Sequence, residues 1–573
     1  MDDDLAKLLI PTFNFFALDA IMLPLSKSTF INLPHPPAAK AAPLSGAVPA
    51  TAPDGIDRIS RLPAGILRNI VSRLPVKDAA RTTVLSARWR RVWHTTPLVL
   101  VDAHLVRSDG ANTIGTACRA STSSSRLGDG QRERDLTGVP RPRSLADAVS
   151  SVLAAHPGPF RSVYLVGTPM EKQQDKLALW LQHLVAKGIQ ELFFINRIRT
   201  SDVAVLLPAT IFRCTSLTKL YIGFWRFPEA EAANLTRTAG FPYLHELGLF
   251  SLLMKERDLA FVLERCPVLE KLLIVGSRWP VSLRVQSHSL RCVEVCEGIA
   301  SEITVVHASH LERLLLWEAW GGGNSTNISF KIKIGHAPKL RFLGFLVPGM
   351  HKLEIGNTVI KAETKASPNT TVPSVQMLAV QVKLGTRIEA RMLPSFLRCF
   401  PNVETLYVQS GNDDIKFLGS QSTGTGKINL KFWKEAGPIE CVQHHIKKVV
   451  LREFRGTRSE LDFLKFIAEH AKVLEKMVIV LTHGHSPSDA IGTNLKTKMS
   501  SANWANACCE LMILQSPFHQ EGTAWCYLAA FDLSNPDPFD VSKCVNGKCL
   551  SHKCTIPVSS CKSLLHTLGN VSF

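Results

Sequence analysis

A short apolar pattern recurs along this chain and restricts the folds that it can adopt. From residue 160 onward, apolar side chains repeatedly occupy positions one, four and six of a six-residue stretch. Such triplets arise by chance in any apolar chain, so the spacing carries more weight: the early ones start about 21 to 29 residues apart. Units of that length stack into solenoids in which each repeat contributes one strand. The ten occurrences are Phe160/Val163/Leu165, Ile189/Leu192/Phe194, Leu217/Leu220/Ile222, Leu244/Leu247/Leu249, Leu269/Leu272/Ile274, Leu290/Val293/Val295, Leu311/Leu314/Leu316, Leu340/Leu343/Phe345, Val375/Leu378/Val380 and Val403/Leu406/Val408.

A second signature precedes three of these triplets. An Arg-Cys pair opens "RCTSLTKLYI" (213–222), "RCPVLEKLLI" (265–274) and "RCFPNVETLYV" (398–408). The residues before each pair have the pattern of a helix end, so the cysteine is expected to pack at the turn into the strand. A regular asparagine ladder is missing and the period drifts after residue 345. We therefore predict an irregular α/β leucine-rich-repeat solenoid over residues 146–436, with a concave face lined by strands.

A compact helical unit is expected at residues 56–100. Its first helix has a prolyl residue near each end and an apolar stripe, made of Ile66, Leu67, Ile70 and Leu74. Asp78 is placed to cap a second helix start. A last helix is predicted to carry an apolar face flanked by Arg81, Arg88 and Arg91, and that face consists of Val84, Leu85, Trp89, Val92 and Trp93. Helices this short cannot bury their apolar faces alone, so the unit is expected to bind a partner.

The region from residue 437 predicts a β-α-β unit. "IKKVVLREF" (446–454) has the pattern of a strand, and "RGTRSE" (455–460) that of a turn with a helix cap. The next helix has one apolar face, made of Leu461, Phe463, Leu464, Ile467 and Leu474, and "LEKMVIVL" (474–481) reads as another strand. This unit either continues the solenoid or caps its open end. We place it at residues 437–540.

The remaining segments are expected to be extensions and linkers. Residues 1–55 include a Pro- and Ala-rich stretch, and residues 101–145 are loaded with Ser, Gly and Arg. Three aspartates follow the first methionine, and their negative charge is opposite to the positive charge at the start of a secretory signal. Prolines break the apolar run that follows. The chain is therefore expected to be soluble and intracellular, with its fourteen cysteines reduced. Residues 541–573 are predicted to be a disordered, cysteine-containing tail.

Signatures of catalysis and of cofactor binding are missing from the sequence. It contains no Gly-x-Ser-x-Gly, phosphate-binding Gly-x-x-x-x-Gly-Lys or His-Glu-x-x-His motif, and no cofactor is predicted. A zinc site from Cys544, Cys549, His552 and Cys554 was weighed, because these are zinc ligands. Their spacing matches no finger or knuckle, so no metal is predicted. The net charge of +18 allows an acidic partner, which could be nucleic acid, an anionic membrane surface or an acidic protein, and does not choose among them.

The helical unit resembles the F-box domain in the form found in large plant families. The residues that carry the resemblance are Leu62-Pro63, Ile66-Leu67, Ile70, Leu74-Pro75, Asp78, Ala80, Thr82, Ser86, Trp89 and Trp93. Ala64-Gly65 departs from the acidic residues usual in the family. "LREFRGTRSELDFLKFIAEHAKVLEKMVI" (451–479) looks like the FBD domain that often follows such repeats, and "DLSNPDPFD" (532–540) is similar to the close of grass members.

The resemblance implies a non-catalytic substrate receptor of a cullin-based ubiquitin ligase, in the nucleus or cytoplasm. The F-box would bind a Skp-type adaptor, and through it a cullin scaffold, while the repeats and FBD domain would hold an unknown target protein. Neither nucleic acid nor membrane is an implied partner; a basic nucleic-acid-binding protein is the alternative reading. The implied adaptor-binding residues are Leu62, Pro63, Ile66, Leu67, Ile70, Leu74, Pro75, Asp78, Leu85, Ser86, Trp89 and Trp93.

Overall fold

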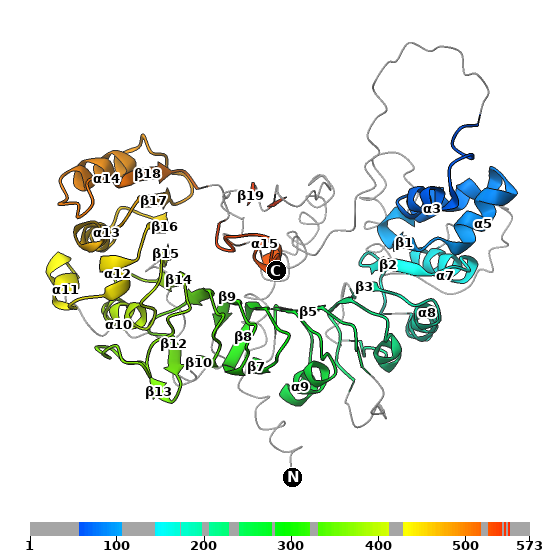
Figure 1. Cartoon of the computed structure of the whole chain (residues 1–573), viewed down its shortest axis with the longest axis horizontal. Coiled ribbons are helices and arrows are strands. Elements are labelled where there is room, and N and C mark those ends of the chain that lie inside the picture. Colours follow the sequence, from blue (N-terminus) through cyan, green and yellow to red (C-terminus); the bar gives the residue numbers. More distant parts are fainter. Residues whose placement is uncertain are drawn as a thin grey trace, which may run out of the picture. The chain divides into compact units, whose positions relative to one another are not determined.

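The fold was examined in a computed structural model. The described residues are 57–105, 144–171, 173–196, 205–228, 240–277, 281–320, 330–411, 428–516, 525, 527–540, 544–545 and 548–549. The chain divides into two compact units. The described residues up to Leu244 belong to the first unit, and those from His245 onward belong to the second. The expected leader, the loop after residue 105 and most of the expected tail lie outside the described residues. Each unit is described by itself (Figure 1).

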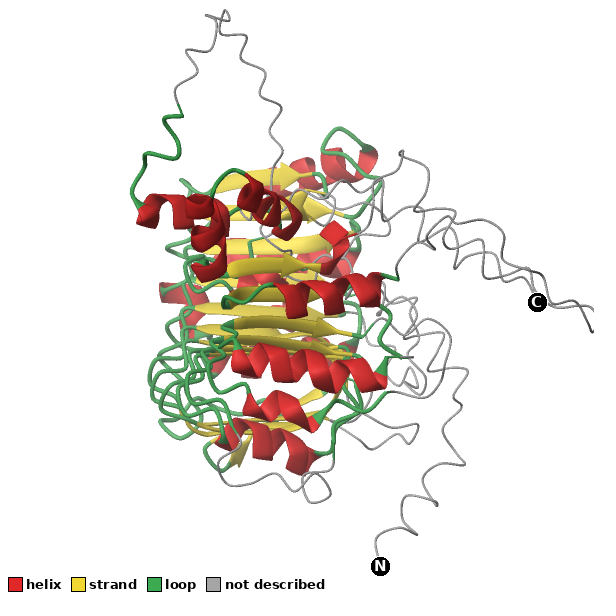
Figure 2. Ribbon diagram, turned by 90° about the vertical axis from the view of Figure 1, so that its right-hand side faces the viewer, coloured by secondary structure: helices red, strands yellow, loops and turns green. Residues whose placement is uncertain are grey.

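The first unit joins the N-terminal helices to the start of the repeats. Its helices are α3 (Ala64–Ser72), α4 (Val76–Arg81), η1 (Thr82–Val84), α5 (Ala87–Thr95), η2 (Asp102–Leu105), α7 (Leu145–Ala155), α8 (Gln174–Ala186) and η3 (Ala209–Arg213). Its strands are β1 (Leu98–Val101), β2 (Phe160–Leu165), β3 (Glu191–Ile195) and β4 (Lys219–Gly223), paired in that order and all parallel. Figure 2 shows strands side by side with helices covering one face.

The second unit is built on a parallel sheet that follows the chain order. Neighbouring strands pair in the sequence β5 (Glu246–Phe250), β6 (Lys271–Val275), β8 (Cys292–His307), β9 (Arg313–Trp320), β11 (Phe342–Leu346), β14 (Met377–Val382), β15 (Thr405–Ser410), β16 (Lys448–Phe454), β17 (Lys476–Leu481) and β18 (Glu510–Leu514). The helices are α9 (Glu256–Glu264), α10 (Arg387–Arg398), α11 (Leu430–Glu435), α12 (Glu440–His444), α13 (Arg458–His470), α14 (Ala490–Ser500) and α15 (Tyr527–Phe531). Figure 1 shows α10, α12 and α13 on one face and α15 on the other.

A second, smaller sheet replaces the helices over part of this unit. β7 (Val281–Gln286), the later half of β8, β10 (Phe330–His336) and β12 (His351–Ile355) pair in parallel, and β13 (Thr358–Val359) closes the edge antiparallel. β8 contributes to both sheets, and Glu297, at φ 51°, marks its bend. The side chains between the two sheets are buried, for example Ile303 and Ile332. The apolar triplets do not include β7, β10, β12 or β13.

The predicted repeat pattern is confirmed. All ten apolar triplets fall on or directly before a strand of the two parallel sheets, and their side chains are buried. The three predicted cysteines, Cys214, Cys266 and Cys399, are also buried, directly after η3 and α9 and at the end of α10. Burial raises the pKa of each of these thiols to about 12, so they serve as small apolar side chains. The α/β solenoid is therefore the observed architecture.

The predicted β-α-β unit is formed by β16, α13 and β17. Thr457 caps α13: its hydroxyl accepts from the amide of Glu460, whose carboxylate accepts from the amide of Thr457 at 2.9 Å. This reciprocal pair satisfies two backbone donors that the helix leaves open. The unit continues the sheet instead of ending it, because β18 pairs with β17 beyond it.

Two local expectations in the N-terminal helices are wrong. Asp78 does not cap a helix start: Pro75 occupies that position, and Asp78 pairs with Arg81 at 2.8 Å within α4. Val84 and Leu85 do not share a helical face with Trp89, because Ser86 interrupts the helical conformation and caps α5. A capping serine ends the helical hydrogen bonding on its N-terminal side, so the periodicity does not carry across it.

Candidate functional site

The N-terminal helices expose apolar side chains instead of burying them. Of the eleven large apolar side chains exposed among the described residues, five lie between residues 59 and 85. They are Ile59, Ile66, Ile70, Val84 and Leu85. Val84 is 83% exposed and Leu85 63% exposed. Exposed apolar side chains at this density are unusual for a small helical unit and are typical of surfaces that take part in interactions.

The other predicted site residues divide into surface and interior positions. Pro63 and Ser86 are exposed, while Leu62, Leu74, Pro75, Asp78 and Trp93 are half-buried. Leu67 and Trp89 lie inside, at 0% and 4% exposure. The structure thus places ten of the twelve residues at or near the surface. Leu67 and Trp89 act on that surface only through the packing that they support.

Polar contacts hold the segment before α3 against α5. The Trp89 indole donates to the Ser60 hydroxyl at 2.7 Å, and the Arg88 guanidinium donates to the carbonyl oxygens of Ser60 and Leu62. Arg88 is therefore engaged in the fold. Nine basic and three acidic side chains occur in residues 57–105. The surplus gives the helical unit a positive field that favours an acidic partner.

A buried carboxylate links the helical unit to the first repeat. Asp102 follows β1, which pairs with β2, and its side chain is 1% exposed. Its Oδ2 accepts from the amides of Gly167 and Thr168 and from the Thr168 hydroxyl, at 2.7 to 2.9 Å. Burial raises the pKa of Asp102 despite these bonds. The helices and the first strands therefore form one continuous structure.

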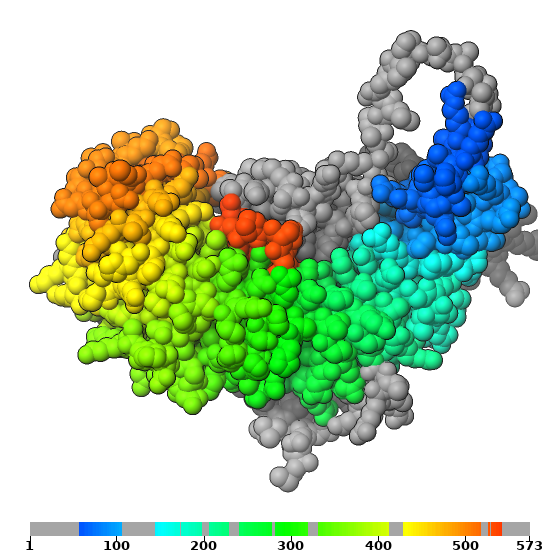
Figure 3. Space-filling view, viewed as in Figure 1, coloured from blue at the N-terminus to red at the C-terminus, as the bar shows by residue number. Residues whose placement is uncertain are grey.

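The strand face of the second unit is covered by the C-terminal part of the chain. We name residues 525–540 the strap. The Trp525 ring stacks on Trp317 with centroids 5.7 Å apart, and its indole donates to Glu294 Oε1 at 2.9 Å. At the other end of the strap, the carbonyl of Phe539 accepts from the Arg452 guanidinium. Figure 3 shows this segment in orange-red, seated against the green part of the unit. The predicted target-binding face is thus partly occupied by the chain itself.

Arg313 holds the middle of the strap. Its guanidinium, in a side chain that is 2% exposed, donates to the carbonyl oxygens of Ala530 at 2.6 Å and Asp532 at 2.9 Å, and also to those of Leu533 and Asn535. These include carbonyls at the end of α15 that have no partner inside the helix. One buried guanidinium therefore supplies the hydrogen bonds for the carbonyl oxygens of a turn that has no regular secondary structure.

Glu294 lies beneath the strap, fully buried. Its Oε1 accepts from Trp525 and from the Cys296 thiol, and Oε2 has no hydrogen-bond partner within the described part of the chain. Burial raises the pKa of Glu294 to about 8, although the Trp525 and Cys296 hydrogen bonds and the nearby Arg313 lower it. Glu294 is therefore mostly protonated in the folded protein at neutral pH.

This protonation predicts a stability that depends on pH. Because the pKa is raised on folding, the contribution of Glu294 is fully present below about pH 4.5 and is lost as the pH rises through about 8. Relative to Glu294→Gln, which cannot ionise, wild-type protein should lose up to about 1.4 kcal/mol of unfolding free energy per pH unit in that window. Urea unfolding of both proteins between pH 5 and 8.5 measures the difference. Parallel stability curves would contradict the assignment.

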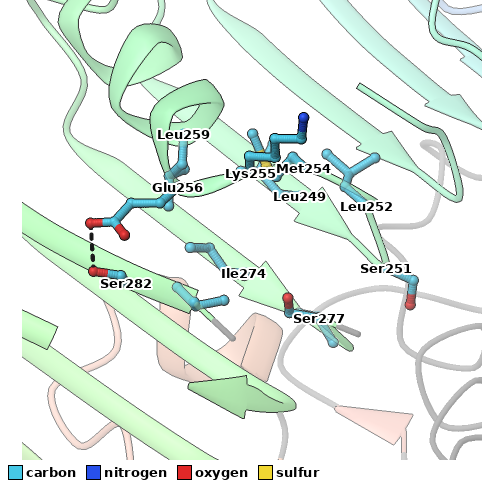
Figure 4. A pocket seen from close by; sticks show the side chains of 12 residues that line it. Leu249, Ser251, Leu252, Met254, Lys255, Glu256, Leu259, Ile274, Ser277 and Ser282 are labelled. Atoms are coloured by element: carbon cyan, nitrogen blue, oxygen red, sulfur yellow. Dashed lines mark hydrogen bonds between the residues drawn. The ribbon is translucent and has the colours of Figure 1, made fainter. Parts of the chain in front are cut away.

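A pocket lies between the start of α9 and the ends of β5 and β6 (Figure 4). Apolar residues such as Leu249, Leu259 and Ile274 form most of its lining, and Ser282 donates to Glu256 at 2.7 Å at one side. Its lining includes no histidine and no cysteine, so the pocket offers neither an imidazole base nor a thiol nucleophile. It is better suited to an apolar side chain than to a reaction.

Metal and membrane sites were also considered. Within the described ranges, no cluster of three or more His, Cys, Asp or Glu side chains is arranged to hold a metal ion. The backbone of the short strand β19 (Cys544–Val545) pairs antiparallel with β20 (Lys548–Cys549), whereas His552 and Cys554 lie outside the described residues. Among the helices of the described part, none has the length and apolar character needed to span a bilayer.

Comparison with protein families identifies three regions. Residues 59–100 match the F-box domain, and residues 434–479 match FBD. Residues 177–408 match the leucine-rich repeats described as those of the FBD-associated F-box protein At5g56370. The FBD match ends with β17, so α14, β18 and the strap lie beyond it.

Comparison with curated proteins finds relatives from Arabidopsis thaliana. The chain is 28% identical to F-box/FBD/LRR-repeat protein At1g13570 over 37% of its own length and 43% of that protein. It is 22% identical to F-box/LRR-repeat protein 13 over 78% of its length and 94% of the relative. It is 28% identical to F-box/LRR-repeat protein At3g59200 over 75% and 84% of the two chains. The likeness to the last two relatives therefore extends over about three quarters of the chain.

Proposed function

Because this chain is an F-box protein with leucine-rich repeats and an FBD domain, we propose that it is the substrate-recognition subunit of a cullin-based ubiquitin ligase. The F-box binds a Skp-type adaptor, and through it a cullin scaffold. The repeats and the FBD domain hold a target protein. The ligation chemistry resides in other subunits, and this chain contributes by keeping the target near a ubiquitin-charged enzyme.

The observation that carries the proposal is the exposed apolar surface of the F-box helices. Ile66 and Ile70 on α3, together with Val84 and Leu85 before α5, present branched side chains that a free protein would otherwise bury. Burial of four such side chains in an interface supplies several kcal/mol at about 25 cal/mol per Å². The surrounding arginines speed the approach of an acidic adaptor.

The alternative of nucleic-acid binding has less support. Base stacking needs aromatic faces that are open to the ligand. In α5, Trp89 is buried and Trp93 contacts the His156 ring, with centroids 4.8 Å apart. Arg88 donates to backbone carbonyls instead of facing outward. The alternation of arginine and tryptophan is better explained by helix packing.

Co-purification with a recombinant plant Skp-type adaptor tests the proposal. We expect the full chain to form a stoichiometric complex, and Leu62→Ala combined with Pro63→Ala to abolish it, because both residues lie at the start of α3. Ile388→Ala, at an exposed position on α10, is the matched control and should bind like wild type. A wild-type chain that captures no adaptor would refute the proposed function. Retained binding in the double variant would refute only the site.

A further inference from the structure

The last part of the strap occupies a slot in the strand face. We name residues 532–540 the hook. The Phe539 side chain is fully buried, and its ring lies against those of Phe345, Tyr407 and Trp525, at centroid distances of 5.5, 5.5 and 5.9 Å. These partners come from three separate places in the chain: β11, β15 and the strap itself. Together they form an aromatic cage for one side chain.

An acidic position lies beside the cage. Asp537 Oδ2 accepts from the Tyr407 hydroxyl at 2.6 Å and lies 3.6 Å from the Lys448 ammonium. Lys448 also donates to the Tyr407 hydroxyl at 3.2 Å. Burial and the neighbouring Asp537 raise the pKa of Tyr407, so its hydroxyl remains a donor. The slot therefore selects a carboxylate two residues before an aromatic ring.

The FBD domain supplies the charged half of this slot. Lys448 and Arg452 both lie on β16, inside the FBD match, and Arg452 donates to the carbonyl of Phe539. A main-chain contact of this kind is independent of sequence, whereas the Asp537 and Phe539 contacts depend on it. The FBD strand thus helps to read an extended segment that carries an acidic residue, any residue and then an aromatic one.

The two ends of the strap are held to different extents. In the stretch 525–531, Trp525, Tyr527 and Phe531 are all buried, which is the larger part of the apolar contact. The hook contributes one buried aromatic ring; Ser534 and Pro536 are exposed, and the Asp537 and Lys448 side chains are 18% and 33% exposed. Contacts between partly exposed charges stabilise a structure only weakly. Arg313 holds the carbonyl oxygens of Asp532, Leu533 and Asn535, so only the end of the hook, residues 536–540, should open while residues 525–535 stay in place.

We propose that the end of the hook, residues 536–540, is an exchangeable occupant of a peptide-binding site formed by the repeat strands β11 and β15 and the FBD strand β16. A target segment of the same chemistry, an Asp or Glu two residues before a Phe or Tyr, binds in the slot while the end of the hook is displaced. That the segment belongs to a ubiquitination target rests on the proposed function; the site itself does not. The end of the hook lowers the apparent affinity for the target by the fraction of time that it fills the slot.

Peptide binding to the full chain tests the site. The probe is a fluorescein-labelled nonapeptide, DLSNPDPFD, followed by fluorescence anisotropy. Phe539→Ala empties the cage in cis and should bind the probe about tenfold tighter than wild type. Adding Lys448→Glu should remove that gain, and Ser534→Ala, at an exposed hook position, should behave as wild type. A probe in which the residues that correspond to Asp537 and Phe539 are changed to Lys and Ala should not bind. A folded Phe539→Ala protein that binds the probe no better than wild type would overturn the proposal.

Hydrogen exchange of the wild-type protein keeps the proposal testable if Phe539→Ala does not fold. The amides of Phe539 and Asp540 should exchange through a local opening, well before those of β8 and β9. Exchange of the hook only together with those strands would mean that the strap is a permanent part of the core, and would overturn the proposal. Adaptor capture depends on the F-box alone. Loss of adaptor capture therefore bears on the proposed function, and failure of peptide binding bears on the hook, as two separate results.

Discussion

Replacing Arg313 by methionine is expected to lower the free energy of unfolding by about 3–5 kcal/mol. Methionine fills similar space but donates no hydrogen bond, so the carbonyl oxygens of Ala530, Asp532 and Asn535 lose their buried donor. Each unsatisfied buried acceptor costs about 1–3 kcal/mol. Urea unfolding of the full chain, followed by tryptophan fluorescence, measures the effect.

Arg341→Met is the matched control for this prediction. Arg341 and Arg313 both place a guanidinium over the Phe342 ring, at 5.3 and 5.0 Å from the centroid. Arg341 is exposed, however, and donates to the side chain of Gln376 instead of to the strap. Its loss should cost no more than about 0.5 kcal/mol. Equal losses in the two variants would contradict the role assigned to the strap contacts.

Val84→Glu combined with Leu85→Glu is expected to weaken adaptor binding by about a hundredfold or more. Both side chains are exposed in the free protein, at 83% and 63%, so fold stability should change little. In a complex, each new carboxylate would have to be buried in an apolar interface without a hydrogen-bond partner. A hundredfold loss corresponds to about 2.7 kcal/mol, a small part of that cost.

Surface plasmon resonance against an immobilised adaptor checks this second prediction. Leu179→Glu is the control, because Leu179 is 49% exposed on α8 and lies outside the F-box match. It places one glutamate at an exposed leucine, like each of the two substitutions in the test variant, and should bind like wild type. Unaltered binding by the Val84/Leu85 variant would move the adaptor site away from this surface and back to residues 62–75.

Local patterns predicted the elements that local physics determines. The apolar triplets correctly placed β2 to β6, β8, β9, β11, β14 and β15, because side chains at alternate strand positions must share the buried face. The sequence around Thr457 predicted a helix start, because a capping box involves residues only three apart. At the helical unit, Ile66, Ile70 and Leu85 were predicted to lie at the binding surface and are exposed, whereas Leu67 and Trp89 were predicted there and are buried.

Contacts between distant parts of the chain were not predictable in the same way. The strands β7, β10 and β12 alternate apolar and polar residues, as many exposed strands do. Only their pairing in the folded chain shows that they form a second sheet. The turn at Ser86 interrupts a helical periodicity that would otherwise continue from Val84 to Trp93. The second sheet depends on contacts outside the window that a periodicity covers, whereas the break at Ser86 is a local cap, in which the Trp89 amide donates to the Ser86 hydroxyl, and a helical periodicity does not register it.

The sequence by itself determined the repeated strands and the capped start of α13, because each follows from spacings within one repeat or one helix. Only the tertiary structure decided what covers the strand face. "DLSNPDPFD" has no periodicity, and its partners Arg313 and Tyr407 precede it by 130 residues or more. The buried carbonyls and rings of that segment find partners only after the solenoid has formed, since the solenoid brings β9, β15 and β16 to the same face.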